Sequence, residues 1–406
     1  MRCSFSEGLR SVLGERSKLF TLLWILTFSS IFLISLVNPA IPYLVEVFVT
    51  EEAAAVTLIG FLNASFNLSK TLANVPGGIL ADKLGRKILI TFSLLILPFS
   101  FLLYYLSDNC YYLIAGELVG GIAIGLLVPA VSALVADITS AAALSTAYGI
   151  FNLSWILSQI PSPILGGFLS NVVGLKFPFL VALIASIPCI IASLKLDGRA
   201  EAVKHVEDSE KPSREGGGSP RGSYGRTLAL FCGVEVLNGL GDGILATLLI
   251  VYPLYALRVS VLEMGVIFSV SWGVATAISQ IPGGRLADRF GEKPLIIASI
   301  MGFTPILILL PTAQTLTQYL FLLGLACVIG NLSIPAYSSW LATSIPSTKR
   351  GAGFGATSAA FGSGSIIGPL IGSILWNILK PNAIIAFTSA AIIFASTIPL
   401  ICMIKS

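Results

Sequence analysis

The sequence predicts an all-α membrane protein of twelve transmembrane helices in two pseudo-symmetric six-helix bundles. Composition, the length of the apolar segments and an internal repeat together predict this fold. Of the 406 residues, 55% are hydrophobic and 11% are charged, whereas an average soluble domain is roughly 25% charged. So little charge cannot cover a water-facing surface of this size, so most of the surface must face hydrocarbon.

The apolar segments are continuous and about twenty residues long, as a helix that crosses a bilayer requires. A membrane barrel would instead alternate apolar and polar residues over short strands. Six spans are expected in the first half, at residues 19–47, 56–80, 88–106, 111–136, 142–170 and 177–194. Six more are expected at residues 227–256, 262–286, 294–310, 316–343, 351–376 and 382–404. Ser260 and Glu263 have the spacing of a capping box, which predicts the start of the eighth helix.

Between the two sets of spans the chain becomes charged and contains a Gly-Gly-Gly-Ser-Pro stretch at residues 216–220. Such a composition is typical of a flexible, solvated linker. We therefore expect an N-terminal six-helix bundle at 1–194, a cytoplasmic linker at 195–226 and a C-terminal six-helix bundle at 227–406.

The basic residues orient the chain. All but four of its 24 Lys and Arg residues fall on the side of the amino terminus and the linker, the exceptions being Lys70, Lys176, Arg258 and Lys380. Cytoplasmic loops carry an excess of Lys and Arg. Both termini and the linker are therefore expected in the cytoplasm, and the protein is expected to be a multi-pass monomer of the plasma membrane, with the lipid bilayer as its partner.

The two halves repeat one another. Residues 76–87, PGGILADKLGRK, reappear as residues 282–293, PGGRLADRFGEK, at a shift of 206 residues. The same register still holds where Asn171 matches Asn377. A register kept without gaps over this length indicates a duplicated six-helix unit. Two parallel halves with a site at their interface are a recurrent transporter architecture.

The loop after the second span has a distinctive sequence, formed by Gly78, Asp82, Lys83, Gly85, Arg86 and Lys87. The second copy keeps Gly284, Asp288, Arg289 and Gly291 and departs at Glu292. With the twelve spans and the repeat, these loops resemble the signature loops of the major facilitator superfamily over nearly the whole chain. The branch that it most resembles is that of the twelve-helix drug/proton antiporters. The resemblance implies two bundles that rock around a central cavity, which opens alternately to each side.

The loop is also the place where we expect a gate. Its glycines permit a tight turn, and Asp137, at the cytoplasmic end of the fourth span, is placed to accept a bond from Arg86. Asp82 is placed to pair with a neighbouring cation. A link that forms in one conformation and breaks in the other is what a two-state gate needs. The alternative is a static loop anchor.

Two antiporter-like patterns are imperfect. Antiporters of the family often carry Arg-x-x-x-Gly in the fourth span, where this chain has Glu117 ahead of Gly121. The Gly-x-x-x-Gly-Pro pattern of the fifth span begins here with Ser158, and a closer copy begins at Gly364 in the eleventh span. Because small residues at every fourth position permit close helix packing, we interpret both stripes as structural.

Ionisable residues inside the spans indicate the site. Four lie well within them: Lys70, Glu117, Glu235 and Asp242. A charge at the bilayer centre costs about 2.5–3.5 kcal/mol and normally faces the bundle interior. Asn238 shares one helix face with Glu235 and Asp242, because the three are spaced i, i+3, i+7. By the family resemblance, the first, fourth, seventh and tenth spans line the cavity, which places Asn38, Glu117 and this face on its wall.

One cation cannot neutralise three carboxylates, so at least two of them must meet a proton, a cation or water. Burial raises the pKa of a carboxyl group, which makes such a group able to carry protons. We expect Asp242, Glu235 or Glu117 to do so, and favour Asp242, the deepest of the three. The alternative is a structural pair of Lys70 with one carboxylate, the others reaching water in a wide cavity.

These features predict a secondary transporter of a small organic solute, coupled to protons and working by export. A facilitator or an importing solute–proton symporter is the second possibility, and a transporter-fold receptor that moves nothing is the third. The chain contains no phosphate-binding loop of the Gly-x-x-x-x-Gly-Lys type. We expect no enzymatic activity, no cofactor, no metal and no nucleic-acid partner.

Overall fold

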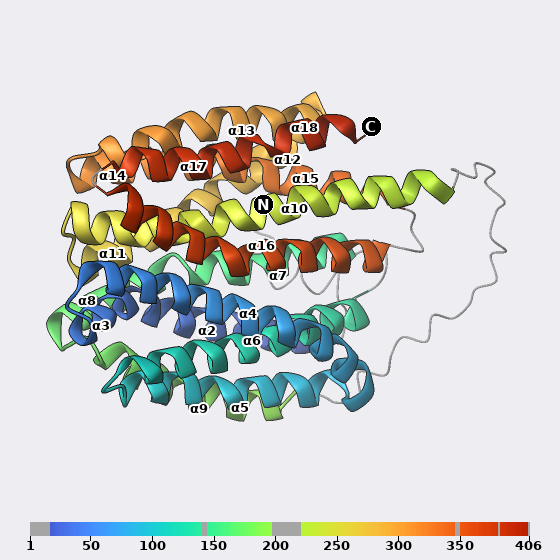
Figure 1. The fold of residues 1–406 in the computed structure, drawn as a ribbon. Helices are drawn as coiled ribbons and strands as arrows, with labels where there is room; N and C mark the ends of the chain where they lie inside the picture. Colours follow the sequence, from blue (N-terminus) through green and yellow to red (C-terminus); the bar gives the residue numbers. More distant parts are fainter. Residues whose placement is uncertain (1–16, 140–143, 197–220, 346–349, 381, 405–406) are drawn as a thin grey trace, which may run out of the picture.

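The computed structural model describes residues 17–139, 144–196, 221–345, 350–380 and 382–404. Within these ranges the chain forms helices and no strand, grouped along the sequence into twelve spans. The spans lie side by side along one direction (Figure 1). The predicted all-α fold of twelve spans in two halves is therefore confirmed.

The first half contains six spans, four of which are single helices. These are α4 at Glu52–Leu84, α5 at Arg86–Tyr105 and α6 at Cys110–Ile138, and α9 at Phe177–Leu194 follows as the sixth span. The first span is interrupted and comprises α2 at Ser17–Val37, the 3-10 turn η2 at Asn38–Ala40 and α3 at Ile41–Phe48. The fifth comprises α7 at Leu144–Ser158 and α8 at Pro161–Val172. Pro39 and Pro161 explain both interruptions, since proline has no backbone N–H for the helical ladder.

The second half also contains six spans. Its spans are α10 at Arg221–Val251 with the π-helix η4 at Tyr252–Ala256, then α11 at Val261–Phe268, the π-helix η5 at Ser269–Val274 and α12 at Ala275–Phe290. The ninth span is α13 at Glu292–Leu309 with η6 at Leu310–Thr312, and the tenth comprises α14 at Leu316–Asn331 and α15 at Ser333–Ser344. The eleventh is α16 at Arg350–Leu379, and the twelfth comprises α17 at Ala383–Ala395 and α18 at Thr397–Met403. The predicted capping box is confirmed, since the Ser260 and Glu263 side chains each bond the other's backbone N–H.

Two helices are longer than hydropathy predicts. The second begins at Glu52 rather than at 56, and the seventh begins at Arg221 rather than at 227, inside the expected linker. An apolar run marks only the part of a helix that hydrocarbon covers, and polar residues such as Arg226 continue the helix beyond it.

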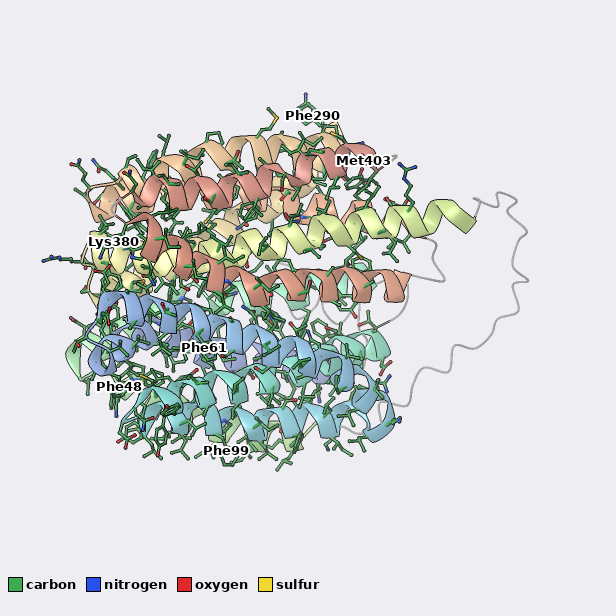
Figure 2. The ribbon with its side chains drawn as sticks, in the orientation of Figure 1. Phe48, Phe61, Phe99, Phe290, Lys380 and Met403 are labelled. Atoms are coloured by element: carbon green, nitrogen blue, oxygen red, sulfur yellow. The ribbon has the colours of Figure 1, made fainter. Side chains whose placement is uncertain are left out.

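Ten of the described helices are long and apolar enough to cross a membrane. The two other spans are α4, which carries Lys70 midway, and the fifth, which is divided into helices of 15 and 12 residues. Large apolar side chains cover the outside of the molecule (Figure 2), among them Phe99 and Phe290, which are 60% and 58% exposed. The chain is therefore a multi-pass membrane protein.

We call the end of the molecule where α2 and α10 begin the linker end, and the end where α4 and α11 begin the far end. At the far end one apolar core joins both halves, for example through Leu44, Ile59, Leu248 and Met264. Towards the linker end the core divides into one cluster within the first half and another within the second. The halves are thus packed together at the far end and separate from each other at the linker end.

The duplication is visible in equivalent helix contacts. A Cβ added to Gly77 of α4 would lie 3.1 Å from Pro129 Cγ of α6. At the shift of 206 residues, a Cβ on Gly283 of α12 would lie 3.0 Å from Pro335 Cγ of α15. The same glycine–proline contact therefore joins the second span to the fourth and the eighth to the tenth.

Candidate functional site

Two adjoining chambers lie between the halves. The first, of about 360 Å³, is lined mainly by the first half, and the second, of about 580 Å³, mainly by the second half. Gln159 and Trp272 line both chambers, so these two side chains form the boundary between them.

The structure places all six predicted cavity residues on chamber walls. Asn38, Lys70 and Glu117 line the first chamber. Glu235, Asn238 and Asp242 line the second, along one face of α10. The roles of these residues in proton coupling stay predictions.

The charges on these walls do not form close ion pairs. No carboxylate among the described residues lies within 4 Å of the Lys70 ammonium, the distance of an ion pair. Lys70 and Asp242 nevertheless attract each other electrostatically. The Tyr104 hydroxyl neighbours Glu117, and that of Tyr337 neighbours Glu235. The Asp242 side chain is exposed on the chamber wall. The alternative of a tight pair between Lys70 and a carboxylate is therefore not seen in this conformation.

The boundary between the chambers was not predicted. Trp272 lies in the π-helix η5 and stacks on Phe268, with ring centroids 4.5 Å apart. π-helical segments interrupt α-helices and are frequent at functional sites. Gln159 lies at the break between α7 and α8 and donates from Nε2 to the Trp155 carbonyl at 3.3 Å. Pro161 is the sequence signal for that break, whereas nothing in the sequence marks the π-helix.

Asn63 and Asn67 are further residues of the first chamber that sequence reasoning missed. Both lie on α4 close to Lys70. Asn63 donates from Nδ2 to the Ile59 carbonyl of its own helix at 3.1 Å. Asn67 donates to the Ser365 carbonyl of α16 at 3.2 Å, which joins the two halves beside the chamber. The signal available in the sequence was the recurrence of polar side chains on one face of the second span.

Two seams close the far end. In the first, α8 packs on α11 so closely that a Cβ on Gly167 would lie 2.6 Å from the Val261 carbonyl oxygen. In the second, α4 packs on α16, where a Cβ on Gly60 would lie 2.6 Å from the Pro369 carbonyl oxygen. Tyr43 also donates across the halves to the Val259 carbonyl at 2.5 Å.

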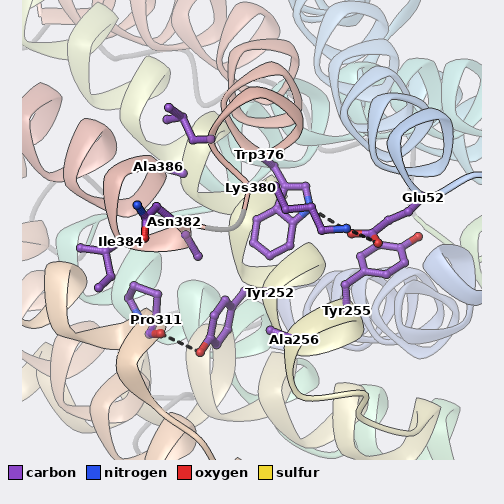
Figure 3. A pocket seen from close by; sticks show the side chains of 12 residues that line it. Glu52, Tyr252, Tyr255, Ala256, Pro311, Trp376, Lys380, Asn382, Ile384 and Ala386 are labelled. Atoms are coloured by element: carbon purple, nitrogen blue, oxygen red, sulfur yellow. Dashed lines mark hydrogen bonds and ion pairs between the residues drawn. The ribbon is translucent and has the colours of Figure 1, made fainter.

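Polar contacts strengthen the seam between α4 and α16 at its far end. Glu52 forms an ion pair with Lys380 and accepts from Trp376 Nε1 at 3.4 Å (Figure 3). Asn377 donates from Nδ2 to the Ala53 carbonyl at 3.0 Å. Glu52, Trp376 and Lys380 also line a separate pocket of about 370 Å³ at the far end, together with Tyr252 and Tyr255.

The seam between α4 and α16 ends before it reaches the linker end. Its contacts continue as far as Thr71 and Gly362, where an added Cβ would lie 2.7 Å from the threonine Oγ1. Nearer the linker end, a Cβ on Gly78 or on Gly355 would meet nothing within 4 Å. Together with the division of the core, this arrangement closes the chambers towards the far end and leaves the halves apart at the linker end.

The loop between α4 and α5 has the geometry that its glycines predict. Gly85 has φ 93° and Gly291, its counterpart between α12 and α13, has φ 87°, a region that strongly favours glycine. Arg86 Nε lies 2.9 Å from Asp137 Oδ2, which ties the loop to α6. This contact lies within the first half, and its role in gating stays a prediction.

The remaining gating-loop residues divide by exposure. Lys83 is exposed and Lys87 partly buried, and Asp288 and Arg289 are exposed. The Arg289 guanidinium lies 5.2 Å from the centroid of the Phe290 ring. The side chain of Asp82 lies outside the described residues, so its predicted pairing is not placed.

The second loop makes the equivalent link with different chemistry. Glu292 stands at the position of Arg86, and its Oε1 accepts from Ser339 Oγ of α15 at 3.1 Å. Lys293 donates to the Cys402 carbonyl at 3.0 Å. The first loop is thus joined to the fourth span by an ion pair, and the second loop is joined to the tenth span by a hydrogen bond.

Comparison with known proteins gives a consistent result. The family model described as Major Facilitator Superfamily matches residues 23–229 and 231–405. Multidrug resistance protein 2 of Bacillus subtilis (strain 168) is 25% identical over 383 residues, which covers 91% of this chain and 92% of that protein. Quinolone resistance protein NorA of Staphylococcus aureus (strain MRSA252) is 25% identical over 352 residues, covering 85% and 86%.

Solved structures share the fold. The human organic anion transporter MFSD10 is 19% identical, with a TM-score of 0.69, over 95% of this chain and 99% of that one. The xylose transporter XylE from E. coli, in an inward open conformation, is 14% identical, with a TM-score of 0.70, over 96% of both chains. At these identities the likeness concerns the fold alone.

Proposed function

The chain belongs to the major facilitator superfamily of membrane transporters, and from that premise we propose that it exports a small organic solute in exchange for protons. The observation that carries this proposal is the set of three carboxylates and one lysine on the chamber walls between the halves, which form no close ion pair within the part of the chain that the structure describes. The names of the curated relatives, which include multidrug and quinolone resistance proteins, support export over import.

We place the linker end in the cytoplasm, on the excess of Lys and Arg at that end. In this orientation the plasma-membrane protein faces inward, with its far end sealed and its chambers accessible from the cytoplasm. We further propose that it works as a monomer, because both walls of the chambers come from one chain.

Transport then requires the two halves to move against each other. We take residues 1–194 and 227–406 as the moving units and residues 195–226 as the connection between them. The seams at the far end would open while the linker end closes, and the link of Arg86 to Asp137 would bias this equilibrium. A device of this kind needs only a contact that differs between two states.

Proton coupling is assigned to the carboxylates. A carboxylate without a close cation, inside a membrane protein, exchanges its proton for another cation more readily than one in a salt bridge. Asp242 is the favoured carrier because its side chain is exposed on the wall of the chamber and lies midway along α10. Glu235 and Glu117 are the other candidates.

The test is internal pH in proteoliposomes that contain a trapped pH indicator and are challenged with a panel of small organic compounds. Export by exchange predicts that solute movement drives protons in the opposite direction. The response should be lost in Asp242→Asn and kept in Lys195→Met, which removes an exposed lysine away from the chambers. Solute exchange with a flat internal pH would replace the proposal by a facilitator, and protons that move with the solute would replace it by a symporter.

A receptor that binds without transport is the remaining alternative, and solute counterflow separates it. Labelled solute should accumulate transiently in liposomes preloaded with unlabelled solute, since counterflow needs movement of both faces of the site. Binding without counterflow would remove the transport proposal for this chain.

A further inference from the structure

We propose that Lys70 and Asp242 form a two-point site for a zwitterionic aromatic solute, whose carboxylate binds Lys70 and whose ammonium binds Asp242. The inference rests on the proposed transport function and names the substrate class of that same site. It follows from the placement of the two charges, from the gap between them and from the side chains around that gap.

Lys70 provides the anionic contact. It lies on α4 in the first half and lines the first chamber, and within the described residues its ammonium makes neither an ion pair nor a hydrogen bond to protein. A cation inside a membrane protein normally has an anionic or carbonyl partner. Asn67 adds a second donor, because its amide has two N–H groups, one of which donates to the Ser365 carbonyl.

Asp242 provides the cationic contact from the opposite half. Its side chain is exposed on the wall of the second chamber. It attracts Lys70 electrostatically, yet the two groups do not meet within 4 Å. A solute that carries both charges would replace this one attraction across a gap by two local, hydrogen-bonded ion pairs, and charge-assisted bonds of this kind are strong.

The space between the two charges suits an aromatic body. The two chambers meet at Gln159 and Trp272, and Trp155 and Phe66 line the first chamber, as Lys70 does. Indole and phenyl faces bind flat rings by stacking and by burial of apolar area. Volumes of about 360 and 580 Å³ lie within the range of small-molecule sites.

The arrangement also links the substrate to the proton. The solute's ammonium and a proton would compete for the same carboxylate of Asp242, so the site would hold one or the other. After a zwitterion has left on one side of the membrane, a proton would take its place on Asp242 while the site returns to the other side. Since Lys70 belongs to the first half and Asp242 to the second, a bound zwitterion would contact both moving units.

The test is equilibrium dialysis of radiolabelled probes with the purified full-length protein in detergent, near neutral pH. The probes are 4-(aminomethyl)benzoate and 4-(aminomethyl)phenylacetate, which are zwitterions, with the methyl ester of each as the cation and the N-acetyl derivative of each as the anion. The wild-type protein should bind at least one zwitterion about tenfold more tightly than either of its derivatives.

The variants should give a crossed pattern. Lys70→Met should weaken the zwitterion and the N-acetyl anion by about tenfold and leave the ester unchanged, and Lys70→Arg should restore both. Asp242→Asn should weaken the zwitterion and the ester and leave the N-acetyl anion unchanged. Lys195→Met, a lysine outside the chambers, should leave all three at wild-type affinity.

Three outcomes would overturn the site. The wild-type protein could bind each zwitterion and its derivatives with equal affinity, it could bind none of the probes, or both variants could lose affinity for all probes equally. Because dialysis uses no proton gradient, the result is independent of the export proposal. A crossed pattern together with a flat internal pH in the liposome assay would sustain the zwitterion site and overturn proton exchange.

Discussion

The seam between α8 and α11 gives the most direct test of how the halves move. We consider the substitution Gly167→Ala. The added Cβ would lie 2.6 Å from the Val261 carbonyl oxygen and 2.8 Å from Leu262 Cα, whereas carbon atoms in contact normally lie about 3.5–4.0 Å apart. Both neighbours are backbone atoms, so no change of rotamer relieves the overlap, and α11 must move away by roughly 1 Å.

The overlap exists only while the far end is closed. Overpacking of this size costs about 1–3 kcal/mol, and a state in which α8 and α11 have separated avoids it. If the substitution acts on the closed state alone, the ratio of far-end-open to far-end-closed molecules should rise by about 5- to 150-fold. Spin labels at positions 111 and 321, exposed residues of α6 and α14 near the far end, would report the change as a longer distance between the halves.

The control is Gly149→Ala in α7, since a Cβ there would meet nothing within 4 Å. It introduces the same methyl group into the same half without touching a seam. Both variants are made in an otherwise wild-type background in which the six cysteines have been replaced by alanine, and this background alone is the reference. A distance distribution for Gly167→Ala that matches both Gly149→Ala and the wild-type background would refute the reasoning.

Three further predictions concern the links and the boundary. Arg86→Gln removes the ion pair with Asp137, a partly exposed contact worth at most about 1 kcal/mol. The transport rate should therefore change by up to about fivefold. A further change in the double variant with Asp137→Asn would show that the two residues act separately. Glu52→Gln breaks the ion pair with Lys380 across the halves and should raise the population of spin-labelled molecules with an open far end by up to about fivefold. High salt should have the same effect on the unsubstituted background, because it screens the charges. If neither change alters the population, the ion pair does not contribute to closing the far end. Trp272→Ala removes a side chain that lines both chambers. Bulkier solutes should then compete with the labelled solute in counterflow, whereas an unchanged size limit would show that Trp272 does not separate the chambers.

The fold could be predicted because its main determinants are local. Continuous apolar runs fix the spans, and the repeated segment at residues 76–87 and 282–293 fixes the two halves. The errors lie at helix ends such as Arg221 and Glu52, because hydropathy detects hydrocarbon cover and not helical hydrogen bonds. The placement of Lys70 and Asp242 on chamber walls was also predictable, because a charge within an apolar span must face the interior of the bundle.

The parts of the site that escaped prediction depend on contacts between distant segments. Trp272 lines the boundary because a π-helix turns it there, and its local sequence is that of any apolar helix. Glu52 and Lys380 lie 328 positions apart and meet only when both seams close. The gap between Lys70 and Asp242 likewise depends on how far apart the halves stand, which no spacing along the chain encodes.

The use of glycine within and between the halves indicates which interfaces are free to move. Inside the second half, α16 lies on α10 along a whole stripe, where Gly364, Gly368 and Gly372 each bring two backbones together. Between the halves, close backbone contacts such as those of Gly60 and Gly167 occur towards the far end and are joined by a few weak polar links. Separating α16 from α10 would give up close packing along the stripe within one half, whereas parting the halves gives up the two far-end seams and an ion pair that is partly exposed to water. We therefore expect the two bundles to move as units, with the far-end seams parting while the close packing of α16 on α10 is kept.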